Sequence, residues 1–264
     1  MTSAATRPAD RIDEAFVSHG RRAALMPYLM AGFPDLDASR EVGLACADSG
    51  GDLLELGIPF SDPLADGPVI HEAATRALAA GVRPTDALRV CESLAERIPV
   101  VLMVYANLVL GGGPDAFLER AAAAGAAGLI VPDLPHDESA ELLAACDRRG
   151  LALVPLAAPT TSSERLAAIG PDARGFVYTV SLTGTTGERS ELPPDLADTV
   201  ARVRAAASVP VAVGFGVSTG AQAAAVAELA DGVIVGSRLV RAAGEGGAAA
   251  VARVVTELAE ALEE

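Results

Sequence analysis

The sequence predicts an α/β fold: a single (β/α)8 TIM barrel over residues 1–264, with an extra N-terminal helix and an insertion after strand 2. Continuous apolar runs of strand length recur along the chain, helical patterns fill the intervals between them, and polar or glycine residues follow the runs. Unbroken apolar runs are typical of parallel strands buried on both faces. Strands that alternate with helices in this way over roughly 250 residues favour the barrel.

The predicted elements follow one another without a linker. A leading helix is expected over residues 9–20, with Ile12, Phe16 and Val17 on one face. Two helices, around 70–80 and 85–97, occupy the long interval after the second strand. The eight strand-like runs lie at 24–31, 52–56, 99–105, 128–131, 151–156, 175–180, 210–214 and 232–236.

One later helix carries local signals at both of its ends. Asp137 has the short polar side chain that caps helix N-termini, and Gly150 suits the left-handed conformation beyond the C-terminus. Arg148 and Arg149 bring positive charge to the last turn, where the helix dipole favours it. Because no composition break interrupts the alternation, we expect one domain. A doubly wound open sheet is the alternative architecture.

The composition of the chain excludes several classes of function before any motif is considered. The net charge of −15 argues against binding to nucleic acid or to anionic membranes. No apolar run reaches the roughly 18 residues of a membrane span. The first residues lack the basic-then-apolar order of a secretory signal. We therefore expect a cytoplasmic protein.

All 20 basic residues are arginine, and the lack of lysine excludes several mechanisms. A Schiff-base aldolase, a covalently held pyridoxal phosphate and the lysine of a P-loop all require it. The histidines, His19, His71 and His136, form no close-spaced ligand pair, so no metal site is expected. The three cysteines are far apart in probable helices and are expected to be buried, reduced thiols.

The most informative stretch is residues 53–68, LLELGIPFSDPLADGP, in which an apolar strand runs into a loop rich in glycine and proline. Glu55 places a carboxyl group in the apolar strand, which is costly unless the group is paired, hydrogen-bonded or functional. Asp62, Asp66 and Glu72 follow it. A glutamate in an apolar wall beside a second acid lets two carboxyl groups hold different protonation states. Solvated acids on an ordinary loop are the alternative interpretation.

Glycines after the seventh and eighth strands indicate a phosphate site. In such barrels the chemistry lies at the C-terminal ends of the strands, and a phosphate often sits there on backbone N–H groups and a short extra helix. Residues 214–216 read Gly-Phe-Gly, and Gly236 precedes Ser237, from which the short helix is expected over 237–240. The hydroxyl-rich loop 181–189 follows the sixth strand and is suited to cover the site. Simple turns are the alternative role for these glycines.

The whole chain closely resembles the tryptophan synthase α chain family. The residues that carry the resemblance are 53–68, 105–108 (YANL), 131–135 (VPDLP) and the two glycine turns. The resemblance implies a barrel that cleaves indole-3-glycerol phosphate to indole and glyceraldehyde 3-phosphate. It also implies an α2β2 heterotetramer with a tryptophan synthase β chain, which carries pyridoxal phosphate and receives the indole. No cofactor is implied for this chain itself.

Motif by motif, the resemblance implies roles for individual residues. It places the catalytic pair on Glu55 and Asp66. In the retro-aldol cleavage Glu55 would deliver and take protons, and ionised Asp66 would stabilise positive charge at the indole N–H. The implied phosphate contacts fall on Gly187, Gly216, Gly236 and Ser237. The implied substrate-binding residues are Tyr28, Tyr105, Asn107, Asp133, Tyr178, Thr186 and Phe215.

Two positions depart from the family pattern, and several alternative functions stay open. Leu182 stands where the family frequently has arginine, and Tyr28 where an apolar aromatic is common. The alternatives are a stand-alone indole-3-glycerol-phosphate lyase, another phosphate-binding barrel such as a sugar-phosphate isomerase or epimerase, and a non-catalytic regulatory subunit. The resemblance places the contact with the β chain on loop 57–68 and around Asn107–Leu108.

Overall fold

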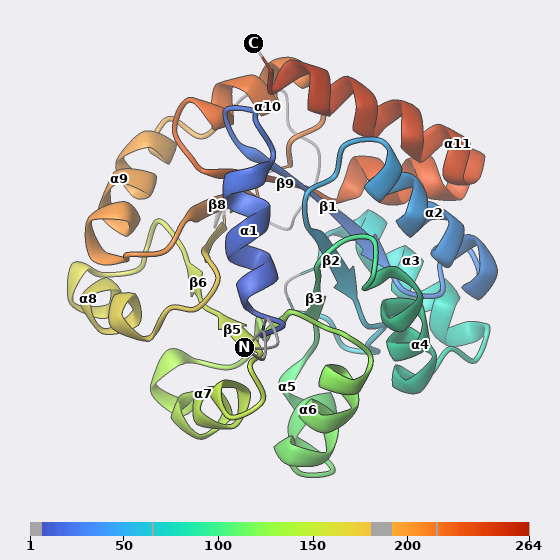
Figure 1. Ribbon diagram of the computed structural model, residues 1–264, viewed down its shortest axis with the longest axis horizontal. Helices are drawn as coiled ribbons and strands as arrows, with labels where there is room; N and C mark the ends of the chain where they lie inside the picture. The colour runs from blue at the N-terminus through green and yellow to red at the C-terminus, as the bar shows by residue number, and fades with distance from the viewer. Residues whose placement is uncertain (1–6, 65, 181–191, 215, 264) are drawn as a thin grey trace, which may run out of the picture.

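The structure is a computed structural model that describes residues 7–64, 66–180, 192–214 and 216–263. It confirms the (β/α)8 barrel: parallel strands form the centre and helices surround them (Figure 1). The sheet order is β5-β4-β3-β2-β1-β9-β8-β7-β6. The strands are β1 (Ala24–Met30), β2 (Leu54–Gly57), β3 (Val100–Met103), β4 (Gly128–Ile130), β5 (Ala152–Val154), β6 (Leu156–Ala157), β7 (Val177–Val180), β8 (Val211–Gly214) and β9 (Gly232–Val235).

β5 and β6 are two halves of one predicted strand, interrupted at Pro155. β5 pairs with β4 on one side, and β6 pairs with β7 on the other. Proline has no N–H to give to a ladder, but the carbonyl of Pro155 accepts a hydrogen bond from the Tyr178 N–H at 2.9 Å. The chain is thus continuous where the ladder changes partner, so the strands fill the eight positions that the sequence predicts.

Helices alternate with the strands, and α3 and α4 are the two expected after β2. The short α5, after β3, was not predicted. α11 begins at Ser237, as expected, but bends at Gly246 and Gly247 and continues beyond them. In the described ranges, no helix has the length and apolar character needed to cross a membrane. The helices are α1 (Asp10–Ser18), α2 (Leu36–Asp48), α3 (Pro68–Ala79), α4 (Pro84–Leu94), α5 (Ala106–Leu110), α6 (Pro114–Ala123), the 3-10 helix η1 (His136–Glu138), α7 (Ala140–Asp147), α8 (Ser163–Asp172), α9 (Leu196–Ala206), α10 (Gly220–Ala227) and α11 (Ser237–Ala261).

The predicted cap at Asp137 is wrong. Pro135 starts the separate 3-10 helix η1, so Asp137 lies inside a helical turn and α7 begins only after Ser139. The Asp137 carboxylate instead accepts a hydrogen bond from Arg165 at 3.0 Å. The opposite end agrees with prediction, because Gly150 has a φ of 68°, in the left-handed region.

The three cysteines are buried and unpaired, as expected. Cys46 lies in α2, Cys91 in α4 and Cys146 in α7. Burial raises the pKa of Cys91 to about 12 and that of Cys146 to about 12, so both stay protonated thiols at neutral pH. They contribute to packing as small apolar groups.

α1 closes the barrel at the N-terminal ends of the strands. Figure 1 shows it lying across the middle of the molecule. Ile12 and Phe16 are buried with the side chains that fill the barrel interior, and the Phe16 ring lies 5.6 Å from that of Phe176. Val17 is 82% exposed, so its predicted place on the same face is wrong. One residue of helix turns it about 100° away from Phe16. The open mouth is therefore at the C-terminal ends of the strands.

Removing the Phe16 ring should destabilise the barrel. We expect Phe16→Ala to lower the free energy of unfolding by about 3–5 kcal/mol, because it opens a cavity in the barrel interior. The neighbouring exposed residue provides the control, and Val17→Ala should change stability by about 0.5 kcal/mol or less. Urea unfolding measures both. Equal effects of the two changes would show that α1 does not close the barrel.

Candidate active site

Glu55 lies in the wall of the barrel mouth. It occupies the second position of β2, paired in register with Tyr28 of β1 and Val101 of β3. Only 1% of its surface is exposed, and neither carboxyl oxygen has a hydrogen-bond partner among the described residues. Burial, and to a smaller extent the nearby Asp66, together raise the pKa of Glu55 to about 8. At neutral pH this carboxyl group is mostly protonated and can donate a proton.

Asp66 approaches the same place from the loop before α3. Burial raises its pKa, while a hydrogen bond from Tyr105 and the nearby His71 lower it. The Tyr105 hydroxyl lies 3.4 Å from Asp66 Oδ1. The structure thus brings Glu55 and Asp66 together in different surroundings: among the described residues, no donor reaches Glu55, whereas Tyr105 donates to Asp66. Such a difference suits two carboxyl groups with separate roles.

All three tyrosines of the sequence surround these two acids. Tyr28 and Tyr178 are buried, and burial together with the charges of Glu55 and Asp66 raises their pKa values far above the ordinary one. The Tyr105 ring stacks on Phe60, with ring centres 4.8 Å apart and an angle of 19° between the planes. An aromatic wall of this kind suits a flat apolar group beside the carboxyl pair.

Two glycines at strand ends make room for the tyrosines. A Cβ atom on Gly57 would lie 2.2 Å from the Tyr28 hydroxyl oxygen, and one on Gly214 would lie 2.4 Å from that of Tyr178. Any other residue at these positions would displace the rings. The packing of Gly57 and Gly214 against tyrosines and the stacking of Phe60 were not predicted from the sequence, which placed Gly214 in the expected phosphate turn. The only sequence signals were glycines at the last strand positions and an aromatic residue in the acidic loop.

Asn107 and Asp133 lie on neighbouring segments at the mouth, and both are exposed. Asp133 Oδ1 accepts a hydrogen bond from the Ala106 N–H at 2.8 Å, so its described contact is with the first turn of α5. This contact stabilises the start of that helix. The remaining predicted residues, Thr186, Gly187 and Phe215, lie outside the described residues, as does Leu182.

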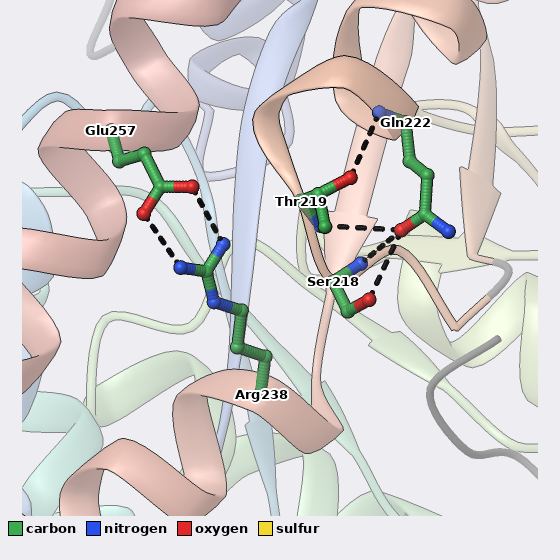
Figure 2. Close-up of polar contacts among 5 residues, drawn as sticks. All are labelled: Ser218, Thr219, Gln222, Arg238 and Glu257. Carbon is green, nitrogen blue, oxygen red and sulfur yellow. Dashed lines mark hydrogen bonds and ion pairs between the residues drawn. The ribbon is translucent and has the colours of Figure 1, made fainter. Parts of the chain in front are cut away.

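The helices after β8 and β9 differ at their N-termini: α10 is capped by side chains, and α11 is not. At α10, Gln222 Oε1 accepts from the N–H groups of Ser218 and Thr219, at 2.8 and 3.2 Å, and the Gln222 N–H donates to the Thr219 hydroxyl (Figure 2). This capping box consumes donors that an anion would need. α11 begins at Ser237, which is buried, and its N-cap residue, Gly236, provides no side-chain cap. The uncapped α11 is therefore the better anion site of the two.

Gly216 lies on the same side of the barrel, between β8 and α10, with a φ of 45°. This left-handed conformation favours glycine and orients the backbone of the β8–α10 loop. Among the described residues, no three or more His, Cys, Asp or Glu side chains are grouped to hold a metal ion.

A cavity of about 290 Å³ opens near the C-terminal ends of β4 and β5. Its walls come from the segment after β4, the split strand at Pro155 and α8, and they include Asp133, His136 and Arg165 but neither Glu55 nor Asp66. The His136 and Arg165 side chains are already paired, with Asp172 and Asp137 respectively. Of the predicted site residues that the structure describes, Asp133 alone lines this cavity.

A protonated buried carboxyl group, a second acid and an uncapped helix N-terminus meet at one mouth of this barrel. Together they define the class: a (β/α)8-barrel enzyme that acts by acid–base chemistry on a substrate with an anionic group.

Comparisons with known proteins identify the family. A sequence profile described as "Tryptophan synthase alpha chain" matches residues 15–264. The chain is 49% identical to the tryptophan synthase alpha chain of Synechococcus elongatus over 245 residues, 92% of each chain. It is 44% identical to that of Geobacter sulfurreducens over 252 residues, 95% of this chain and 96% of the relative. Among solved structures, a Mycobacterium tuberculosis tryptophan synthase chain aligns with a TM-score of 0.90 and 43% identity, covering 99% and 100% of the two chains.

The chain belongs to the tryptophan synthase alpha chain family. Membership assigns it the α-subunit role and the carbon–carbon lyase reaction of that family, the cleavage of indole-3-glycerol phosphate. This confirms the expected family, fold and reaction class; the roles of individual residues stay predictions.

The contact between Gly57 and Tyr28 gives a test of the aromatic wall. Gly57→Ala should displace the Tyr28 ring, destabilise the protein by about 1–3 kcal/mol and weaken substrate binding. Tyr28→Phe in the same chain removes the oxygen that clashes and should restore part of both losses. Thermal unfolding and cleavage kinetics measure the two effects. As a control, Gly112→Ala should be neutral, because nothing lies within 4 Å of a Cβ atom there. A Gly57→Ala chain that behaves like this control would refute the close packing.

Glu55 should make the stability of the protein depend on pH. Its pKa rises from the ordinary value of 4.5 to about 8 on folding. The folded state therefore holds this proton more tightly than the unfolded state, and stability falls as the pH rises from 4.5 through 8. Glu55→Gln removes this effect. The free energy of unfolding of the variant, relative to that of the wild type, should therefore increase by at least about 1.4 kcal/mol across that window, the equivalent of one pKa unit. Urea unfolding at pH 5 and 8.5 tests this, and parallel curves for the two proteins would contradict it.

Proposed function

We propose that Glu55 and Asp66 together carry out the retro-aldol cleavage of indole-3-glycerol phosphate. Glu55 donates a proton to indole C3. The Glu55 carboxylate left by this step then takes the hydroxyl proton of the glycerol chain as the carbon–carbon bond breaks and the aldehyde forms. Asp66, ionised, accepts a hydrogen bond from the indole N–H and stabilises its developing positive charge. The observation that carries the proposal is the buried Glu55, whose oxygens have no described partner and whose pKa is raised to about 8. A pKa near the working pH suits a general acid that must also act as a base.

We place the two ends of the substrate on opposite parts of the mouth. The indole packs among Tyr28, Tyr105 and Tyr178, together with Phe215. The phosphate is held by Gly216, Gly236, Ser237 and Gly187, with the uncapped N-terminus of α11 in support. Asn107, Asp133 and Thr186 complete the substrate contacts that we infer from the resemblance.

We further propose that this chain acts as the α subunit of an α2β2 tryptophan synthase. A pyridoxal-phosphate β chain would receive the indole, while this chain works without a cofactor of its own. Exposed apolar side chains support a contact at the predicted surface: Leu64 in loop 57–68 is 85% exposed, and Leu110 at the end of α5 is 44% exposed. We assign the reaction to the cytoplasm from the biosynthetic role of the family, and we treat residues 1–264 as one barrel domain.

Indole release from indole-3-glycerol phosphate tests this function. The chain alone should release indole slowly, and a β chain from the same source should accelerate release steeply. Fast release without a partner would indicate a stand-alone lyase instead. No release under either condition, with glycerol 3-phosphate still bound, would indicate a regulatory subunit.

Substitutions in the acid pair test the assigned roles in the same assay. Glu55→Gln should lower kcat about 10²–10⁴-fold, because the chemistry loses its proton donor. Asp66→Asn should lower kcat about 10²–10³-fold, because the charge that forms at the indole N–H is no longer stabilised. Asp62→Asn is the control: Asp62 is an exposed acid of the same loop, and its loss should leave the cleavage by the isolated chain unchanged. Normal kcat in the Glu55 or Asp66 variant would refute the mechanism.

A further inference from the structure

Arg238 lies at the second position of α11, next to Ser237 of the proposed phosphate site. Its guanidinium group makes two parallel hydrogen bonds to the Glu257 carboxylate, of 3.1 and 2.6 Å (Figure 2). Glu257 also belongs to α11, 19 residues further along the chain. In a straight helix these residues would be about 28 Å apart, too far for any side-chain contact.

The bend at Gly246 and Gly247 makes this contact possible. Both residues leave the helical conformation, and Gly247 has a φ of 58°. The part of α11 after the bend therefore returns toward the start of the same helix. The ion pair closes this return, and it joins the last helical segment of the barrel to the turn that follows β9.

Glu257 also faces the start of α10. The pKa of Glu257 is lowered by Arg238 first and, to a smaller extent, by the backbone N–H of Gly220, the first residue of α10. The two helices approach closely there, since a Cβ atom on Gly220 would lie 3.0 Å from the Ala261 Cβ. One carboxylate thus connects the helices that follow β8 and β9. These strands precede Gly216 and Gly236, which supply the two sides of the proposed phosphate site.

We propose that the Arg238–Glu257 pair is a positioning device for phosphate binding. It holds the N-terminus of α11 against α10 and so sets the spacing between Gly216 and the Gly236–Ser237 turn. Backbone N–H groups bind phosphate well only when they converge on it, and small displacements reduce affinity strongly. Exposed ion pairs usually contribute little, but a bidentate arginine–carboxylate pair is the geometry in which such a contact does matter. This inference rests on the proposed function, because it concerns the phosphate site of that reaction.

Kinetics of the full chain with its β chain test the proposal. Arg238→Ala and Glu257→Ala should each raise KM for indole-3-glycerol phosphate and the inhibition constant of glycerol 3-phosphate about fivefold or more. The kcat should stay within twofold, and the affinity for indole, which carries no phosphate, should not change. The double variant should be no worse than either single variant, because both remove the same contact.

The matched control is Arg174→Ala. Arg174 makes a bidentate pair of the same kind with Asp147, with both hydrogen bonds 3.1 Å, but just before β7 at the closed end of the barrel. This variant should leave both constants unchanged. Glu257→Gln, which keeps the side-chain shape, replaces Glu257→Ala if the alanine variant does not fold.

Two results would contradict the positioning role, and a third would contradict the proposed function. If folded Arg238 and Glu257 variants keep wild-type KM and inhibition constants, the positioning role is wrong. If Glu257→Ala lowers KM while Arg238→Ala raises it, Arg238 contacts the phosphate directly, and the positioning role is again wrong. If the wild-type chain neither cleaves indole-3-glycerol phosphate nor binds glycerol 3-phosphate, the proposed function itself fails.

Discussion

Burial of the Glu55 carboxyl group is the constraint on which the rest of the site depends. A carboxylate without partners costs several kcal/mol in an apolar wall, so the group is held protonated instead. Tyr28 and Tyr178 are buried near this group, and Gly57 and Gly214 leave room for their rings. The barrel supplies the stability that offsets this cost: α1 fills its closed end, and parallel strands buried on both faces surround the site.

Different kinds of interaction dominate at the two ends of the mouth. Around Glu55 and Asp66, side chains dominate. Burial raises both pKa values, Asp66 raises that of Glu55, and Tyr105 and His71 lower that of Asp66. After β8 and β9, the backbone dominates, and the choice of anion site depends on which helix already has a cap. Thr219 and Gln222 cap the start of α10, whereas the N-cap residue of α11 is Gly236, which has no side chain to cap with. A substrate with a flat apolar ring at one end and a phosphate at the other matches this division.

The barrel could be predicted from the sequence because the apolar runs are long and the intervals between them are regular. An error in the bounds of one element does not change this pattern. The sequence predicted Glu55 because a charged residue in an apolar strand is conspicuous. It failed where three-dimensional context decides. Pro135 moved the start of α7 past Asp137, and the helical turn carried Val17 away from Phe16. The roles of Gly57 and Gly214 depend on tyrosines 29 and 36 residues earlier in the chain. The capping box at Gln222 becomes informative only in comparison with the uncapped α11.

The bend in α11 illustrates why such a device is hard to read from sequence. Gly246 and Gly247 resemble an ordinary weak point in a helix, and Arg238 and Glu257 resemble two solvated charges on its surface. Only the fold shows that the glycines turn the helix back and that the charges meet across the turn. A surface pair then acts on the site through the backbone, since the turn it closes is continuous with Gly236 and Ser237. The same Arg238–Glu257 ion pair would therefore both stabilise this end of the barrel and order its anion site.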